Sequence, residues 1–254
     1  ARAVRAAPPL HLCRRSAPGE SFPKRLESGG AVDASRRTDR LKAAGAIHPV
    51  PSGAGRFTLD DVTVVTPQFG GVTHDDDRLT VDDGSIPPLT GAAVRLETNR
   101  GPAAARNAAR PSIATPLVAF VDADVSMPDP EWLSALLWHF DDPQVGLVAP
   151  RVRGESGSPL DLGDEPARVR AGTRVSYVPG AAVVVRVAAF DQVGGFDEGL
   201  RFGEDVDVVW RLDDAGWRCH YDPAVAVWHE PRTSWRERLR QHAGYGTSAA
   251  PLAL

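Results

Sequence analysis

Short apolar runs alternate with helix-period segments along the first half of the chain. The apolar runs cover residues 62–66, 79–82, 93–96, 117–121 and 145–150, and most carry β-branched residues. Two segments between them, "NRGPAAARNAAR" and "DPEWLSALLWHFDD", are Ala-rich or apolar at helical spacing, and Pro102 suits a first helical position. This alternation predicts an α/β fold with a largely parallel sheet flanked by helices, in which ligands bind outside the carboxyl ends of the strands.

The second half of the chain has a mixed pattern. Residues 151–174 are polar with Gly and Pro and predict a loop, and strand character resumes in "VSYVPGAAVVVR". A short helix is expected in "VAAFDQVGGFDEGL", and a second in "GEDVDVVWRLDDAG", with acids at its start. The stretch "WRCHYDPAVAVWHE" predicts a strand, a turn at Pro223 and a strand that ends at His229.

Residues 1–56 differ from the remainder in composition. They are rich in Arg, Ser, Gly, Pro and Ala, and residues 1–42 hold ten basic and four acidic side chains. We expect a basic, low-complexity tail or cap, with at most one short helix that ends before Pro49, followed by one domain over 57–254. The net charge of −4 gives no polyanion-binding footprint and argues against nucleic acid as a partner.

Targeting signals are not evident in the chain. The two cysteines, Cys13 and Cys219, suit a reducing compartment. No apolar run approaches the roughly 20 residues that span a bilayer, and arginine and prolines interrupt the N-terminal residues where a signal peptide would be apolar. These features predict a cytoplasmic protein.

Acidic pairs follow two of the predicted strands. Asp122 and Asp124 end the apolar run 117–121, and such carboxylates suit Mg²⁺ or Mn²⁺, which neutralise nucleotide phosphates. A solvated turn with an acid capping the next helix is the alternative. Asp82 and Asp83 end a neighbouring strand in "VDDGS", where an acid accepts hydrogen bonds from a ribose or a base, or shapes a β-turn.

Four further residues, at three places in the chain, could carry chemistry. Arg106 lies in the predicted helix that starts near Pro102, where an anion site and an exposed arginine face are both compatible with the sequence. Glu204 and Asp205 stand where a helix begins, a place that favours ionised carboxylates, whether as a general base or as a cap. His229 ends an apolar strand, as a metal or phosphate ligand or as a polar terminus.

The order of these motifs resembles the inverting family 2 glycosyltransferases, which have the GT-A fold. The matching series is "VTVVTP", "VDDGS", "NRGPAAARNAA", "FVDADV", "VPGAAVVVR", "VGGFDE" and "GEDVDVVWRL", over roughly residues 60–246. The finer texture in "LVAPRV", "SYVPGAA" and "YGTSAAPL" is similar to the mycofactocin-system glycosyltransferases. The resemblance implies a GT-A-like domain, with a Rossmann-like nucleotide-binding sheet and a mixed C-terminal half.

The resemblance also implies roles on the donor side of the site. Thr66 and Pro67 would lie beside the base of a UDP-sugar, Asp83 would contact the uracil or ribose, and Arg106 would support the nucleotide pocket. The divalent cation, Mg²⁺ or Mn²⁺, would be bound by Asp124, with Asp122 and His229 as further candidates, and Asp122 would face the ribose or the metal. Gly180 and Ala181 would allow close approach of the donor sugar.

On the acceptor side, the resemblance implies that Asp205 is the general base, with Glu204 as its neighbour and Asp197 and Glu198 on the acceptor wall. The expected activity is metal-dependent, inverting transfer of a sugar, glucose first of all, from a UDP-sugar to a hydroxyl of a mycofactocin precursor or its glycosylated form. The resemblance leaves peripheral membrane association open. The segments 68–80 and 151–175 are shorter than is usual in the family.

Two other functions fit parts of the same pattern. A non-catalytic nucleotide-sugar-binding module is compatible with the shortened connection after the first strand. A sugar nucleotidyltransferase would use similar acids, but it usually has a basic, Gly-rich loop after its first strand. The corresponding stretch "TPQFGG" has no Lys or Arg, which disfavours that alternative.

Overall fold

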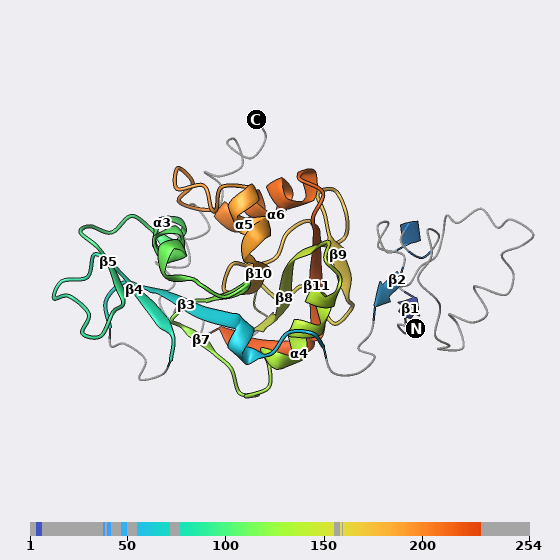
Figure 1. Ribbon diagram of the computed structural model, residues 1–254, viewed down its shortest axis with the longest axis horizontal. Coiled ribbons are helices and arrows are strands. Elements are labelled where there is room, and N and C mark those ends of the chain that lie inside the picture. The colour runs from blue at the N-terminus through green and yellow to red at the C-terminus, as the bar shows by residue number, and fades with distance from the viewer. Residues whose placement is uncertain are drawn as a thin grey trace, which may run out of the picture.

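The computed structural model describes residues 4–6, 38, 40–41, 47–49, 55–71, 77–154, 158 and 160–229 (Figure 1). Most of the predicted basic tail lies outside these residues. Within it, β1 (Val4–Ala6) and β2 (Ile47–Pro49) pair antiparallel in a two-stranded sheet of their own. Thr38, Arg40 and Leu41 are helical, whereas the stretch before Pro49, expected to complete that helix, forms β2.

Four parallel strands build the first half of the main sheet. The 3₁₀ turn η2 (Leu59–Asp61) leads into β3 (Val62–Gln68), which pairs with β4 (Leu79–Asp83) and β6 (Leu117–Val121), and β4 pairs with β5 (Val94–Leu96). β6 is buried along its whole length, as expected for an uninterrupted apolar run covered on both faces. The acids that end β4 and the acids that follow β6 therefore lie at the same edge of the sheet.

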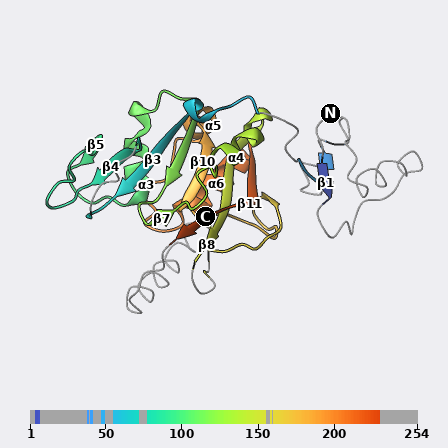
Figure 2. The same cartoon turned by 90° about the horizontal axis from the view of Figure 1, so that it is seen from below.

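The second half of the sheet is mixed, as predicted. β10 (Ala182–Arg186) runs antiparallel to both β6 and β8 (Val145–Arg153), so the sheet is not largely parallel beyond β6. β11 (Arg218–His229) pairs parallel to β8 and antiparallel to the short strands β7 (Val125–Ser126) and β9 (Ala167–Val169). The sheet runs in the order β5-β4-β3-β6-β10-β8-β11-β7. Figure 2 shows β5, β4 and β3 on one side of the sheet and β11 toward the other.

The segment predicted as a loop over 151–174 contains two pieces of strand. β8 continues to Arg153, and β9 covers Ala167–Val169, beside β11. The expected single helix over 129–142 is shorter and consists of α4 (Ser134–Leu137) followed by the 3₁₀ turn η4 (Trp138–Asp141).

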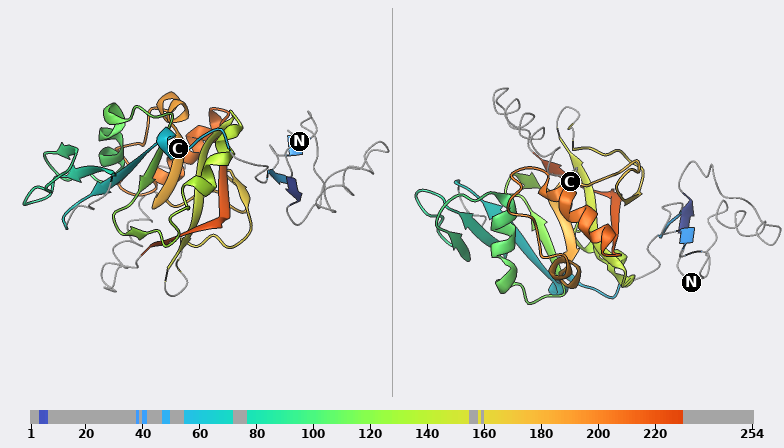
Figure 3. Two further views of the ribbon diagram at one scale, coloured as in Figure 1. Left: turned by 60° about the horizontal axis from the view of Figure 1, so that its bottom comes forward. Right: turned by 90° about the horizontal axis from the view of Figure 1, so that it is seen from above.

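Helices cover both faces of the sheet. α3 (Pro102–Ala108), α5 (Val187–Gln192) and α6 (Glu204–Asp214) pack on one face, and the turn η3 (Arg110–Ser112) follows α3. Figure 1 shows these helices above the strands, and the right-hand view of Figure 3 shows them in front. Their apolar residues, Ala105, Phe190 and Leu212 among them, form one core cluster with the strands. Leu136 and Phe140 of the α4–η4 segment belong to a second cluster on the opposite face.

β11 is one strand where the sequence predicted two. Pro223 was expected to make a turn, but it lies inside the strand, where the register against β8 shifts between Asp222 and Ala226. Proline has no N–H to donate to a ladder, so it is tolerated where pairing is interrupted by a bulge. The continuous strand carries His229 to the edge of the sheet where Asp122 and Asp124 lie.

Position 84, directly after β4, requires glycine for two reasons: its backbone conformation and the atoms around it. Its φ is +75°, and an added Cβ would lie 2.3 Å from the carbonyl carbon of Thr98. We expect Gly84→Ala to lower the free energy of unfolding by about 3 kcal/mol, because left-handed strain and a backbone clash add together. Urea denaturation would measure the effect.

Gly70 provides the matched control for this prediction. Its φ of +72° is nearly the same, but an added Cβ would meet nothing within 4 Å. Gly70→Ala should therefore cost only about 1 kcal/mol, the strain alone. Equal losses in the two variants would show that the contact with Thr98 is not a constraint.

Candidate functional site

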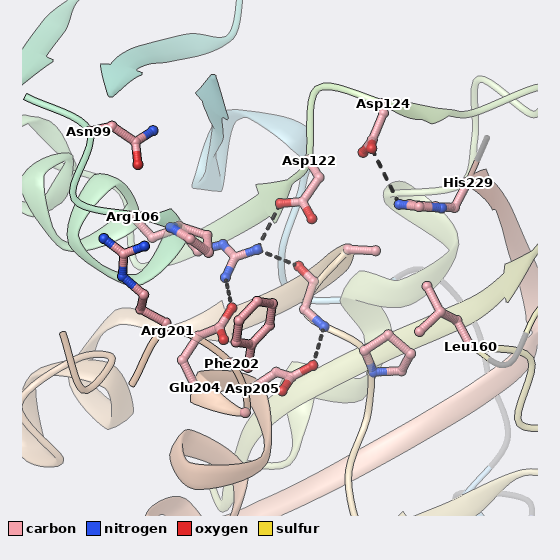
Figure 4. Close-up of a pocket in the computed structure, with 16 residues that line it drawn as sticks. Asn99, Arg106, Asp122, Asp124, Leu160, Arg201, Phe202, Glu204, Asp205 and His229 are labelled. Carbon is pink, nitrogen blue, oxygen red and sulfur yellow. Dashed lines mark hydrogen bonds and ion pairs between the residues drawn. The ribbon is translucent and has the colours of Figure 1, made fainter. Parts of the chain in front are cut away.

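A cavity of about 560 Å³ opens where the first strands end and α6 begins (Figure 4). It is lined by the start of α3, the turn after β6, the loop before β10, the residues that lead into α6, and the end of β11. The lining residues are Asn99, Gly101, Pro102, Arg106, Asp122, Asp124, Leu160, Pro179, Gly180, Ala181, Arg201, Phe202, Gly203, Glu204, Asp205 and His229.

The turn after β6 places two acids in the cavity. The N–H of Asp122 donates to the carbonyl of Ala181 at 2.9 Å, and the N–H of Val125 donates to the carbonyl of Asp122 at 3.1 Å. These bonds hold a tight turn whose Asp124 side chain is 46% exposed and faces His229, with Oδ2 3.4 Å from Nε2. The predicted metal candidates Asp122, Asp124 and His229 are thus brought to one cavity (Figure 4).

Arg106 joins three segments at the floor of this cavity. Its guanidinium donates to Asp122 Oδ1 at 2.7 Å, to Glu204 Oε1 at 3.0 Å and to the carbonyl of Gly180 at 3.1 Å. Only 1% of Arg106 is exposed, and its guanidinium also lies over the Phe196 ring, 5.2 Å from the centroid. The sequence left Arg106 open as an anion site, whereas the structure shows its terminal nitrogens committed to protein oxygens.

Burial and neighbouring charge have opposite effects on the pKa of Arg106, and also on the pKa of Asp122. Burial alone would lower the pKa of Arg106, but the negative charges of Asp122 and Glu204 raise it above its ordinary value. Burial raises the pKa of Asp122, and the charge and hydrogen bond of Arg106 oppose that rise. The guanidinium therefore stays charged and keeps two carboxylates close together in one cavity.

Asp205 is held by backbone N–H groups at the first turn of α6. Its Oδ2 accepts from Gly180 N–H at 3.0 Å, and its Oδ1 accepts from Val206 N–H at 2.9 Å. Burial, followed by the charge of Glu204, raises the pKa of Asp205 to about 6, although the two N–H donors work in the other direction. A carboxylate of this kind is ionised at neutral pH and is more basic than an ordinary aspartate.

This raised pKa links Asp205 to the stability of the fold. Between the ordinary value of 3.8 and the folded value of about 6, the folded chain binds more protons at this site than the unfolded chain does. The contribution of Asp205 to the free energy of unfolding therefore falls as pH rises through this window and stays low above it. Asparagine does not titrate, so Asp205→Asn lacks this pH dependence. We expect its free energy of unfolding, relative to that of wild type, to rise by about 1–3 kcal/mol from about pH 4.5 to about pH 7.5 in urea denaturation. A difference that does not vary with pH would contradict the raised pKa.

Gly180 brings the loop before β10 close to these side chains. An added Cβ would lie 3.3 Å from both terminal nitrogens of Arg106 and 3.3 Å from Asp205 Cβ, tighter than most contacts of that kind. Gly180 and Ala181 both line the cavity, where they were predicted to lie. The absence of a side chain at 180 lets one residue bond both Arg106 and Asp205 through its backbone.

Six residues that the sequence analysis singled out lie outside the cavity lining. Asp82 is fully buried and accepts from the N–H of Ser85 at 2.8 Å. Thr66 and Pro67 belong to β3, and Thr66 is fully buried. Asp83 is buried, and its oxygens accept from the N–H groups of Arg100 at 2.8 Å and Gly101 at 2.9 Å, so it fixes the chain that enters α3. Asp197 accepts from Gly199 N–H. Glu198 pairs with Arg100 at 2.6 Å and accepts from Asn107 at 3.0 Å.

The cavity also contains residues that the sequence analysis did not select. They are Asn99, Gly101, Pro102, Leu160, Pro179, Arg201, Phe202 and Gly203. All except Leu160 stand inside or directly beside the quoted motifs "NRGPAAARNAA", "VPGAAVVVR" and "GEDVDVVWRL". Their position next to a motif was therefore the sequence feature that could have identified them as cavity residues. The segment that contains Leu160 has no such feature.

The donor set fits a divalent cation that is completed by substrate and water. Among the described residues, no group of three or more His, Cys, Asp or Glu side chains could hold a metal ion unaided. Mg²⁺ is commonly bound through one or two carboxylates together with substrate phosphates and water, and Mn²⁺ accepts similar oxygen ligands. Asp124, with His229 at 3.4 Å and Asp122 nearby in the same cavity, offers that incomplete set.

No helix in the described part of the chain is long and apolar enough to cross a membrane.

Two bacterial glycosyltransferases are similar to this chain in amino-acid sequence. A pre-mycofactocin glycosyltransferase of Mycobacterium tuberculosis (strain ATCC 25618 / H37Rv) is 46% identical over 198 residues, covering 69% of this chain and 42% of the relative. This chain therefore spans about two fifths of that relative's length. An N-acetylglucosaminyl-diphospho-decaprenol L-rhamnosyltransferase of the same strain is 46% identical over 56 residues, covering 22% and 18% of the two chains.

Two solved structures share the architecture. The mannosyltransferase PcManGT of Pyrobaculum calidifontis, in complex with GDP-Man and Mn²⁺, has a TM-score of 0.55 at 21% identity, over 72% of this chain and 61% of that one. S. aureus TarS 1–349, in complex with UDP-GlcNAc, has a TM-score of 0.53 at 20% identity, over 68% and 59%. These likenesses establish the GT-A fold. Residues 72–245 match the family described as "Glycosyltransferase like family 2", and the chain belongs to that family of glycosyltransferases.

Proposed function

We propose that this chain transfers a sugar, glucose first of all, from a UDP-sugar to an acceptor hydroxyl in a metal-dependent reaction that inverts the anomeric centre. The observation that carries the proposal is the placement of Asp205. Its carboxylate, with a pKa of about 6, lines the same cavity as Asp124 and His229. A base and a site for a cation–diphosphate pair within one cavity are the two parts that a single displacement requires.

On the donor side, Asp124, with His229 and Asp122 as neighbours, would hold the divalent cation. Such an ion supplies neutralisation of the negative charge that builds on the leaving diphosphate. Asp122 is oriented for this task, because Arg106 binds its Oδ1 and Ala181 binds its backbone N–H. Gly180 and Ala181 keep the adjoining wall free of long side chains, which leaves room for a sugar.

On the acceptor side, Asp205 takes the proton of the attacking hydroxyl. Its two oxygens are oriented by N–H groups of Gly180 and Val206, so the carboxylate does not have to be ordered when substrate binds. Glu204 is engaged by Arg106 and is 8% exposed, so it acts as a positioning residue rather than as the base. One base and one displacement give inversion, so an α-linked UDP-sugar would yield a β-glycoside.

The acceptor is proposed from the relative named pre-mycofactocin glycosyltransferase. A mycofactocin precursor, or its already glycosylated form, is the acceptor class that this likeness favours. The chain spans about two fifths of that relative, so the activity of the longer protein is carried over here as part of the proposal.

The test is release of UDP from a panel of UDP-sugars, with and without acceptor, in Mn²⁺, in Mg²⁺ and in EDTA. We expect metal-dependent release that increases with acceptor, and a β-anomeric proton signal in the product by NMR. Binding of UDP-glucose without hydrolysis or transfer would instead support the non-catalytic binding module. No binding of any UDP-sugar would overturn the UDP-sugar assignment.

Asp124 is expected to set the metal requirement of the reaction. Replacing it with asparagine removes a charged ligand, so the Mn²⁺ concentration for half-maximal activity should rise at least about 10-fold. Asp129→Asn is the control, because Asp129 lies outside the cavity lining and bonds the N–H of Glu131. A metal titration that is the same in the Asp124 variant and in wild type would remove Asp124 from the metal site.

A further inference from the structure

The charges that line the cavity are unbalanced. Four carboxylates belong to Asp122, Asp124, Glu204 and Asp205, and two guanidiniums belong to Arg106 and Arg201, which leaves two negative charges before His229 is counted. A nucleotide diphosphate adds further negative charge. A diphosphate would be repelled by this excess of carboxylates. It therefore needs at least one cation in the cavity that is not already paired with an acidic side chain.

Arg106 is not available as that partner. It is buried, and its terminal nitrogens already donate to Asp122, Glu204 and the carbonyl of Gly180. The positive charge of Arg106 is thus neutralised by Asp122 and Glu204, so it is not free to bind a ligand.

Arg201 has the opposite character. It is exposed, lines the cavity, and makes no hydrogen bond or ion pair with the described part of the chain. Figure 4 shows its guanidinium on the same side as Asn99 and away from Asp124 and His229, with no dashed line to a neighbouring side chain. Among the residues that the structure describes, no anion pairs with this cation, although it lines a cavity of substrate size.

The backbone on both sides of Arg201 is fixed. Leu200 N–H donates to the carbonyl of Asp197 at 3.2 Å, and Gly203, at a φ of +82°, is the N-cap residue of α6. The arginine is therefore presented by an ordered turn directly before Glu204 and Asp205. Its planar guanidinium can bind two phosphate oxygens through two parallel N–H···O bonds, a fixed fork geometry that a lysine ammonium lacks.

We infer that Arg201 binds a phosphate group of the nucleotide-sugar donor, from the side of the cavity opposite Asp124 and His229. This inference rests on the proposed function, because it takes a nucleoside diphosphate as the ligand. The cation held at Asp124 and the guanidinium of Arg201 would then neutralise the diphosphate from two directions.

The test is isothermal titration calorimetry of UDP and of uridine, each with Mn²⁺, against wild type, Arg201→Gln and Arg201→Lys. We expect Arg201→Gln to weaken UDP at least about 10-fold, the size of one lost charge-assisted hydrogen bond, while uridine binds as in wild type. Arg201→Lys keeps the charge but loses the fork, so its UDP affinity should be intermediate. Steady-state kinetics should show the loss in the KM for the UDP-sugar and not in the KM for the acceptor.

Arg170→Gln is the matched control. Its side chain is 57% exposed, and it pairs with Asp213 at the far end of α6. This variant removes the same charge at a position outside the cavity lining and should bind UDP as wild type does.

Three outcomes of these measurements would contradict the proposed role of Arg201. Unchanged UDP affinity in Arg201→Gln, with wild type binding UDP, overturns the role of Arg201 and leaves the proposed function standing. A loss confined to the KM of the acceptor also overturns it, because the anion would then belong to the acceptor. Failure of wild type itself to bind UDP with Mn²⁺ refutes the proposed donor, and the inference with it.

Discussion

Replacing Asp205 with asparagine is expected to lower kcat for sugar transfer by about 10²- to 10⁴-fold, the range for loss of a general base. The asparagine keeps the size of the side chain and one oxygen for the N–H groups of Gly180 or Val206, but it cannot accept a proton. Binding of UDP with Mn²⁺ should change little, because this carboxylate faces the acceptor in the proposed mechanism. Single-turnover assays would separate the two effects.

The pH profile provides a second test of the same assignment. Because the pKa of Asp205 is about 6, the transfer rate of wild type should fall as pH is lowered through 6. Asp207→Asn is the control: Asp207 lies in the same turn of α6, but it pairs with Arg211 and is absent from the cavity lining. A kcat for Asp205→Asn within about threefold of wild type would be incompatible with a catalytic role.

Replacing Arg106 with methionine is expected to cost about 3–5 kcal/mol of stability, because it leaves the carboxylates of Asp122 and Glu204 without their shared cation. For a domain of this size the midpoint of thermal unfolding should fall by roughly 10 °C. Arg110→Met is the comparison. That arginine follows the same helix and pairs with Asp191, but both side chains are more than a third exposed, so its loss should cost under about 1 kcal/mol.

A double variant isolates the charge from the packing. Arg106→Met combined with Glu204→Gln removes one of the stranded charges, so it should be more stable than Arg106→Met alone. If the two variants unfold at the same temperature, or if Arg106→Met is no less stable than Arg110→Met, the neutralising role of Arg106 is wrong. Thermal scans monitored by circular dichroism at a single pH are sufficient for the comparison.

Much of the fold could be predicted because its causes are local. The buried run of β6, Pro102 at the start of α3 and the acids that begin α6 are written in short stretches of sequence. Strand direction is not local: an apolar run reads the same whichever way the chain enters the sheet, and β10 proved antiparallel to β6. The continuity of β11 through Pro223 depends on a register shift against β8, which the sequence of one strand does not contain.

The candidate site shows the same division. The gathering of Asp122, Asp124 and His229 follows from strand ends that meet at one edge of the sheet. The inward orientation of Arg106 does not, because its partner Glu204 lies 98 residues away and no helical period selects one arginine in an Ala-rich helix. Asp83, which stands in the motif "VDDGS", has both oxygens taken by backbone N–H groups of a segment 17 and 18 residues further along.

The guanidinium of Arg106 also determines how far this protein can be divided. It connects α3, the turn after β6, the loop before β10 and the first residue of α6, so the carboxylates of Asp122 and Glu204 share one cation. A fragment that stops short of Glu204 would retain a buried cation with half of its counter-charge, and with it an incompletely formed Asp122 turn. The segments on the two sides of the cavity are thus not exchangeable modules: a chimera that takes residues up to β6 from one relative and residues from β10 onward from another must match the arginine and both carboxylates across the junction.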